Sequence, residues 1–123
     1  MVKKTIKKLK NEKTIDASGQ ILGRFASRMA FELTGKNDPS YERHVFVPRS
    51  ITIVNASKIR VSGKKIKQKI YNRYTGYPSG LKKRTIEEQL RRDSREIIRR
   101  AIWGMLPKNK LRKRYMQYLT ITN

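Results

Sequence analysis

Residues that enzymes and metal sites depend on are scarce in this sequence. It has no cysteine and one histidine, His44, among 123 residues. The lack of cysteine excludes disulfides and thiolate metal sites and fits a reducing compartment. His44 alone cannot build a zinc site, and such a residue is more often used for packing or hydrogen bonding. The nine acidic residues are scattered and no serine stands in a nucleophile motif, so we expect no enzyme, metal or cofactor.

Long apolar runs are also missing, and so are complete phosphate-binding motifs. No stretch of ~18 apolar residues could span a membrane, and no apolar region follows the basic start, so we expect no secretory signal. Gly19 and Gly23 follow a strand and open a helix, but the third glycine of a dinucleotide fingerprint is absent. A structural turn with tight helix packing is the favoured interpretation. We therefore predict neither a membrane partner nor a small-molecule substrate.

Positive charge is what the sequence has in excess. It carries 31 lysines and arginines against nine acids, a formal net charge of +22. Self-repulsion destabilises so charged a compact chain unless a polyanion neutralises it, and nucleic acid gains binding energy by counterion release. The first 61 residues hold 13 basic and five acidic residues (+8), and the remainder hold 18 and four (+14). The second half is the expected main nucleic-acid face.

The pattern along the chain predicts a basic N-terminal arm over residues 1–12 and a single domain over 13–123. A short strand is expected at 13–16, followed by a helix that ends at Gly35 and is blocked by Pro39. Phe31 lies off the apolar stripe of this helix and could serve a second contact surface. The stripe itself recurs at helical spacing: Leu22, Phe25, Ala26, Met29, Ala30 and Leu33.

Strands and helices alternate in the rest of the chain. We expect strands at 51–54, 70–74 and 119–121, a helical turn at 55–59 and a strand fragment at 60–61. Thr85 and Glu88 predict a capping box, and Asp93 or Ser94 begins the next helix. A third helix is expected at 108–117. Ile97, Ile98, Ala101, Ile102 and Met105 are the apolar stripe of the second helix. The order predicts an α/β fold, a three-layer α/β/α domain with a small, four-stranded, mostly parallel sheet.

The segment from Lys64 to Arg84 combines basic residues, aromatics and turn residues, and long connections of this kind are usually functional. Its cations could neutralise phosphates, and its tyrosines could stack on unpaired bases; for Tyr71, a core position is equally expected. Glycine and proline in the stretch 75–80 predict a bent, pre-ordered loop. The RNA-binding candidates here are Lys64, Lys65, Lys67, Arg73, Tyr74, Tyr77, Lys82, Lys83 and Arg84.

Two further groups extend this surface. Arg91, Arg92, Arg95 and Arg99 gather on one face of the predicted second helix, with Trp103 beside them. A dense basic run follows at 108–114, and although such a run is often only a solvated helix face, RNA contact is favoured. The candidates from both groups are Arg95, Arg99, Trp103, Lys108, Lys110, Arg112, Lys113 and Arg114.

Four motifs, in order and spacing, resemble the family of bacterial-type large-subunit ribosomal protein thirteen. They are Asp16-Ala17-Ser18-Gly19 with Leu22-Gly23-Arg24, Asn55-Ala56-Ser57-Lys58-Ile59 with Gly63, Thr75-Gly76-Tyr77-Pro78 with Gly80-Leu81-Lys82, and Gly104-Met105-Leu106-Pro107-Lys108-Asn109. The last is long and specific, and the order and spacing of the motifs match the family over roughly residues 13–119. The resemblance implies the α/β/α fold with four parallel strands, binding of large-subunit ribosomal RNA, neighbouring ribosomal proteins as partners, early assembly into the subunit, and no catalysis.

The sequence departs from that family in two places. After His44 the family usually has acidic residues and a glycine, whereas Phe46, Pro48 and Arg49 stand here. Relatives commonly continue into a C-terminal tail beyond the position of Asn123, so contacts of that tail are expected to be missing. The resemblance implies a cytoplasmic location in the large ribosomal subunit, with an organellar ribosome as the alternative.

Two other functions fit the residues less well. A small nucleotide-dependent enzyme would bind a mononucleotide near Gly19–Arg24, and a free-standing DNA or RNA chaperone would act outside the ribosome. Calorimetric titration with mononucleotides tests the first, and co-sedimentation with large subunits tests the second.

Overall fold

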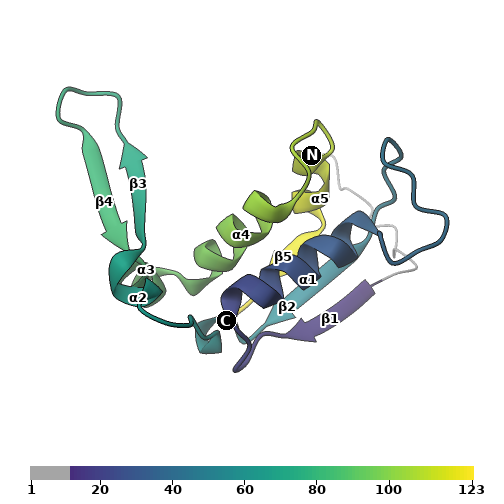
Figure 1. Ribbon diagram of the computed structural model, residues 1–123, viewed down its shortest axis with the longest axis horizontal. Coiled ribbons are helices and arrows are strands. Elements are labelled where there is room, and N and C mark those ends of the chain that lie inside the picture. Colours follow the sequence, from purple (N-terminus) through teal and green to yellow (C-terminus); the bar gives the residue numbers. More distant parts are fainter. Residues whose placement is uncertain (1–11) are drawn as a thin grey trace, which may run out of the picture.

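A computed structural model describes residues 12–123 of the protein (Figure 1). Three strands, β1 (Glu12–Asp16), β2 (Ser50–Val54) and β5 (Leu119–Ile121), form a parallel sheet in the order β1-β2-β5. The predicted arm at 1–12 lies outside the described residues except for Glu12, which belongs to β1. No helix in the described part of the chain is long and apolar enough to cross a membrane.

The sheet has one apolar face. Ile15, Ile51, Ile53, Leu119 and Ile121 are all buried, as period-two alternation requires of residues on one side of a sheet. On the other side Thr14, Thr52 and Thr120 stand in one row, and Thr14 and Thr120 are exposed. The segment 51–54 is therefore buried on alternate residues, not throughout as its β-branched sequence suggested.

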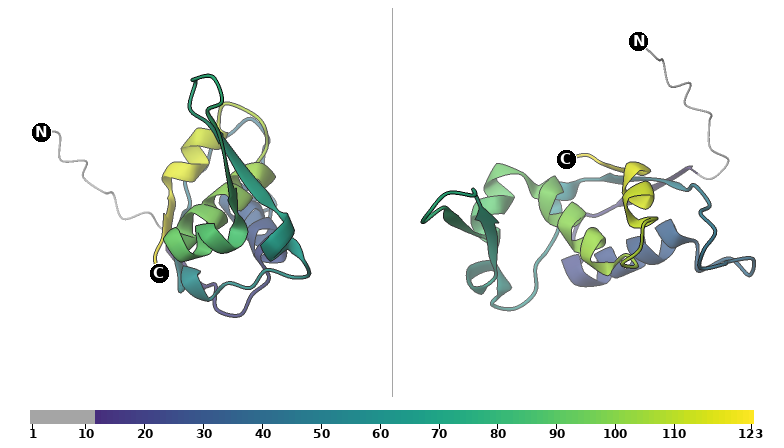
Figure 2. Two further views of the ribbon diagram at one scale, coloured as in Figure 1. Left: turned by 90° about the vertical axis from the view of Figure 1, so that its left-hand side faces the viewer. Right: turned by 90° about the horizontal axis from the view of Figure 1, so that it is seen from above.

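Helices α1 (Leu22–Thr34) and α4 (Ser94–Met105) cover the apolar face of the sheet (Figures 1 and 2). All six residues of the predicted α1 stripe are buried, and Gly35 ends the helix in the left-handed conformation, φ 78°. A Cβ at this position would also lie 2.8 Å from Arg49 Nε, so the Arg49 side chain would have to move to admit one. In α4 the prediction for Met105 was wrong: its side chain is 44% exposed, because it lies at the end of the helix and faces a groove between α4 and α1.

The expected fourth parallel strand does not exist in residues 12–123. Strand β3 (Ile70–Tyr74) instead pairs antiparallel with β4 (Leu81–Thr85) in a separate hairpin, and Arg60 makes only an isolated bridge with Ile21. The three-layer arrangement is likewise not confirmed. What is observed is a mixed α/β fold whose hairpin projects from one end of the body (Figure 2).

Short helices join the hairpin to the body. Helix α2 (Lys65–Gln68) precedes β3, and α3 (Ile86–Arg92) follows β4. Thr85 and Glu88 form the predicted capping box at the start of α3, and Asp93 caps α4. The predicted third helix is shorter than expected, since α5 begins at Arg112 and ends at Gln117. Phe46 packs on Tyr115 and Tyr118, with ring centroids 5.1 and 5.7 Å apart, so this departure from the family pattern anchors the connection before β2.

Candidate nucleic-acid interface

The β3–β4 hairpin is the main feature of the basic segment 64–84. The chain has no acidic residue between Glu42 and Glu87, so both strands are cationic. Because a strand of lysine and arginine lacks apolar alternation, β4 could not be recognised in the sequence. An isolated two-stranded hairpin is marginally stable. Here the base is fixed by packing on α2 and α3 and by a hydrogen bond from Ile86 N to Lys69 O (3.3 Å).

The two faces of the hairpin differ in chemistry. In the observed register Tyr71 is opposite Arg84 and Arg73 is opposite Lys82, and alternation places all four on one face. The other face carries three large apolar or aromatic side chains that are 48–65% exposed: Ile70, Tyr74 and Leu81. The candidates Tyr74 and Lys82 therefore face opposite sides, which sequence alone could not separate without the register.

The tip of the hairpin is a tightly bonded turn. Thr75 N donates to Gly80 O (3.0 Å), and Gly80 N donates to Tyr77 O (2.9 Å). A Cβ at Gly80 would collide with Tyr77 O at 2.7 Å and with Thr75 Oγ1, so only glycine fits. Tyr77 is 74% exposed on this ordered tip, a suitable position for stacking on a base or sugar.

A cavity of about 370 Å³ lies between the hairpin and helices α3 and α4. We call it the basic cavity, because six of its lining residues are cationic and none is acidic: Arg73, Lys82, Lys83, Arg84, Arg92 and Arg100. Within residues 12–123, Arg100 is the only one of the six in an ion pair, with Nε 2.9 Å from Glu96 Oε1. Like charges that face each other across a strand pair are destabilising, so the cavity favours an anionic occupant.

Two residues that the sequence did not single out shape this cavity. The buried Gln89 accepts a hydrogen bond from Arg84 Nη1 (3.0 Å) and donates one to Asp93 O (3.3 Å). Arg100 lies with its Cζ 5.1 Å from the centre of the Tyr71 ring. In the sequence, Arg100 and Glu96 have the four-residue spacing of an ordinary ion pair on a helix surface, so nothing in the sequence indicated a role for Arg100 in the cavity.

Tyr71 is half-buried, a position between the two expected for it. Besides Arg100, Lys69 Nζ lies 5.6 Å from the ring centre. Burial raises the pKa of the Tyr71 phenol, and the charge of Arg100 opposes that shift. The ring serves as a wall of the basic cavity and is only partly available for stacking.

More of the arginines of α4 than of the basic residues of the hairpin are paired with acidic side chains. Arg95 Nε lies 3.0 Å from Asp93 Oδ1, and Arg99 Nη1 lies 3.6 Å from Glu96 Oε2. The Arg95 side-chain hydrogen bond is the main cause that holds the pKa of Asp93 below its ordinary value. These candidates lie along α4, between the hairpin end of the body and α5 (Figure 1).

The second basic cluster surrounds Trp103. Arg112 Cζ lies 4.2 Å from the centre of its ring, and Arg112 Nε donates to Trp103 O (2.8 Å). The arginine thus covers a ring predicted to contact RNA. Lys108 and Lys110 lie in the connection before α5, while Arg112, Lys113 and Arg114 are in its first turn. The remaining candidates Lys64, Lys65 and Lys67 lie at or in α2, at the base of the hairpin.

The turn before α1 is poorly suited to a nucleotide phosphate. The backbone N–H groups of Gly19 and Leu22 donate to Lys58 O (3.1 Å) and Arg60 O (2.9 Å), so they are not free to bind phosphate. The tight helix packing predicted for Gly19 and Gly23 is not observed, since a Cβ on either residue would meet nothing within 4 Å. His44 is exposed, with Nε2 3.4 Å from Glu42 Oε2, and does not pack in the core.

Comparison with known proteins agrees with the resemblance seen in the motifs. The model of the family described as Ribosomal protein L13 matches residues 10–122. The chain is 45% identical over 107 residues to "Large ribosomal subunit protein uL13" of Rubrobacter xylanophilus, covering 87% of this chain and 75% of that protein. The protein of the same name from Thermus thermophilus is 45% identical, with 87% and 76% covered. That of Wigglesworthia glossinidia brevipalpis is 39% identical, with 98% and 84% covered. This chain belongs to the ribosomal protein L13 family.

Proposed function

We propose that the chain is a structural constituent of the large ribosomal subunit that binds ribosomal RNA and supports early assembly of the subunit. Family membership supports the place in the subunit, since the relatives are named as large-subunit proteins. It also supports contact with neighbouring ribosomal proteins. RNA binding is supported above all by the basic cavity, where six cationic residues and no acidic residue line one space.

Phosphate binding in the basic cavity has a clear energetic basis. Five of the six cations have no ion-pair partner within the described residues, so their mutual repulsion is relieved only by an anion. Each phosphate that they neutralise also releases counterions from the RNA. A cavity with arginines from both β-strands and from α3 and α4 recognises the shape of a folded backbone more than its sequence.

The hairpin adds contacts of a second kind. Tyr77 at the tip and Tyr74 on the apolar face are 74% and 65% exposed, and bases stack on such rings without sequence preference. The turn is ordered by its own hydrogen bonds, so less entropy is lost when RNA binds. Phosphates in the cavity and bases on the tyrosines would hold two sides of the hairpin.

Charge reversal of the hairpin tests this proposal. The triple variant Lys82→Glu, Lys83→Glu, Arg84→Glu should bind large-subunit RNA at least about a hundredfold more weakly, because three phosphate contacts are lost. The matched control, Arg24→Glu, Arg28→Glu, Lys36→Glu, changes net charge equally on α1 and beyond its end, and it should lose much less. Equal losses in the two variants would mean that only total charge matters and would reject the hairpin as the site.

A further inference from the structure

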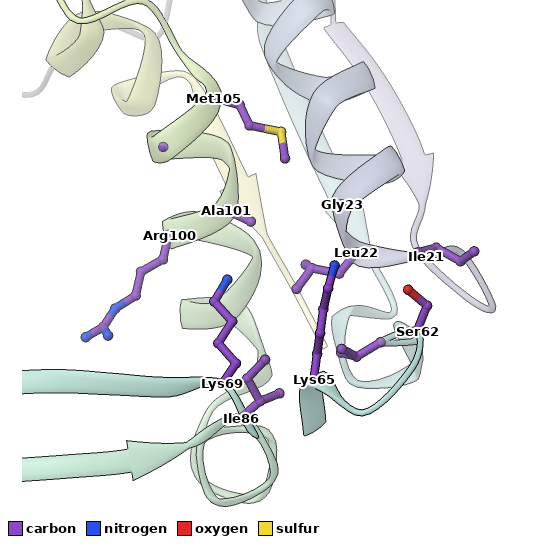
Figure 3. Close-up of a pocket in the computed structure, with 12 residues that line it drawn as sticks. Ile21, Leu22, Gly23, Ser62, Lys65, Lys69, Ile86, Arg100, Ala101 and Met105 are labelled. Carbon is purple, nitrogen blue, oxygen red and sulfur yellow. The ribbon is translucent and has the colours of Figure 1, made fainter. Parts of the chain in front are cut away.

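A second cavity, distinct from the basic cavity, lies between α1 and α4. We call it the groove; its volume is about 300 Å³. Its apolar wall includes Leu22, Ile86, Ala101 and Met105, and its cations are Lys65, Lys69 and Arg100. In Figure 3 the side chains of Lys65 and Lys69 extend into the space between the two helices, and Met105 reaches into it from α4. No lining residue is acidic.

Two helical glycines line the groove, Gly23 in α1 and Gly104 in α4. Neither has a positive φ, and a Cβ built on either would meet nothing within 4 Å. The fold therefore does not require glycine at these positions, although glycine weakens a helix relative to alanine. A physical use remains: without a side chain, the helix backbone can be approached closely by a ligand.

The groove adjoins the basic cavity. Arg100 lines both spaces. Lys69, which lines the groove, lies over the ring of Tyr71, which lines the basic cavity. A chain that leaves the basic cavity past Arg100 would enter the groove directly.

We propose that the groove holds a nucleotide of single-stranded RNA, in continuation of the strand whose phosphates occupy the basic cavity; this rests on the proposed function. The phosphate would lie against Lys65 and Lys69, and the ribose or base against Met105 and the exposed backbone at Gly23 and Gly104. Charge selects an anion, since three cations and no acid line the space. The partly apolar wall then favours an anion with flat, weakly polar parts over a fully hydrated one.

Filling the groove is the direct test. Gly104→Leu adds a side chain where the structure leaves open space, so thermal unfolding should be unimpaired. Its affinity for an unstructured, fluorescently labelled RNA oligonucleotide should fall by about tenfold, the size of one lost nucleotide contact, and its affinity for an RNA duplex should not change. Gln117→Leu on α5 is the matched control, because it adds an exposed leucine outside the groove, and it should bind both probes as the native chain does.

Charge removal gives a second, independent variant. Lys65→Met with Lys69→Met should weaken oligonucleotide binding more than Lys36→Met with Lys58→Met, which removes the same charge elsewhere. Photocrosslinking with a thiouridine-containing oligonucleotide should label the peptides that carry Lys65 or Met105. Crosslinks only elsewhere, or equal affinities of each variant and its control, would overturn the proposal.

Other outcomes of these experiments would show whether the groove proposal alone or the proposed function as well is wrong. If Gly104→Leu weakens binding of a polyglutamate peptide but not of RNA, the groove is a site for an acidic protein and the proposal is wrong. If hairpin charge reversal abolishes RNA binding while both groove variants bind normally, the groove assignment alone fails. If neither set of variants affects RNA binding, the proposed function fails as well.

Discussion

At the scale of single residues, Arg84 differs from the other cations of the hairpin because its guanidinium has a fixed polar partner. Gln89 is buried, receives the hydrogen bond from Arg84, and is itself fixed by its bond to Asp93 O. Gln89 is therefore a positioning residue for the basic cavity. An arginine held in place loses less side-chain entropy when it binds a phosphate.

Gln89→Leu tests that role. We expect RNA affinity to fall about fivefold, the effect of losing one hydrogen bond of about 1 kcal/mol, with no change in the salt dependence of binding because no charge is removed. Arg84→Gln should instead reduce the slope of log affinity against log salt by about one. Titrations of both variants over a range of salt measure the difference. A reduced slope in Gln89→Leu would contradict a purely positioning role.

Asp93, the N-cap of α4, is expected to affect the stability of the protein in acid. Its carboxylate accepts from Arg95 N and Arg95 Nε, both at 3.0 Å, and the side-chain hydrogen bond is the main cause that lowers its pKa below 3.8. A lowered pKa in the folded state contributes stability above the unfolded value, and this contribution is lost as pH falls through the folded value.

We therefore expect Asp93→Ala to lose about 1 kcal/mol of unfolding free energy near neutral pH, the usual effect of losing an N-cap. The difference from the native chain should shrink as the pH falls below 3.8. Denaturant unfolding at several pH values measures this convergence. A difference that stays constant to low pH would show that the charge of Asp93 contributes nothing.

At the scale of elements, the like charges on the two strands of the hairpin reduce its stability. Arg73 and Lys82 are directly opposite each other on the face that lines the basic cavity, and like charges there are destabilising. Lys82→Glu would create a favourable cross-strand pair. If Arg73 and Lys82 are placed opposite each other in order to bind RNA, a substitution that stabilises the hairpin should lower the affinity for RNA.

We expect Lys82→Glu to protect the hairpin amides from hydrogen exchange by a few tenths of a kcal/mol while lowering RNA affinity about tenfold or more. Lys82→Gln is the control, because it removes the repulsion without adding an attraction and should give intermediate results. Loss of both hairpin protection and RNA affinity in Lys82→Glu would indicate that Lys82 has a structural role.

Elements with an apolar period could be predicted, and those without one could not. The α1 stripe, the αL position of Gly35, the capping box at Thr85 and the three parallel strands are local patterns, and each is confirmed. Strand β4 has only one apolar residue, Leu81, before its cations, and its pairing is set by the turn at Gly80. The prediction of a fourth parallel strand was wrong. The segment 70–74 does form a strand, β3, but it pairs with the adjacent β4 in a hairpin.

The candidate site divides in the same way. Charge in the sequence indicated the segment 64–84, but the alternation that separates Tyr74 from Lys82 needs the register. Gln89 and Arg100 come from helices and enter the basic cavity only through tertiary packing. Met105 was assigned to the core because its spacing fits the stripe, yet the helix ends beside the groove and leaves it exposed.

At the scale of the whole molecule, we expect the excess of positive charge to lower the stability of the folded chain. With 31 basic and nine acidic residues, repulsion exceeds attraction, and added salt screens it. We expect the melting temperature of the RNA-free chain to rise with sodium chloride, and to rise further when RNA is added at low salt, because RNA binds the folded state. Differential scanning calorimetry measures both effects. A melting temperature that falls with salt would mean that the few ion pairs outweigh the repulsion.

The same imbalance separates a ribosomal constituent from a free nucleic-acid chaperone. A protein held only by diffuse charge should leave RNA when salt is raised, because affinity falls steeply with each phosphate contact. A protein that is built into folded RNA is also held by contacts that depend on shape, which for this chain we propose to lie in the basic cavity and at the hairpin tip, and such partly buried contacts are screened less by salt. Sedimentation at high salt therefore distinguishes the two.

We propose that the hairpin and the basic cavity hold this chain in the large ribosomal subunit. The decisive experiment is co-sedimentation with large subunits through a high-salt sucrose gradient, with the native chain beside the Lys82→Glu, Lys83→Glu, Arg84→Glu variant. We predict that the native chain sediments with the large subunit and that the variant stays at the top of the gradient. A native chain that stays at the top, or a variant that sediments as fully as the native chain, would contradict the claim.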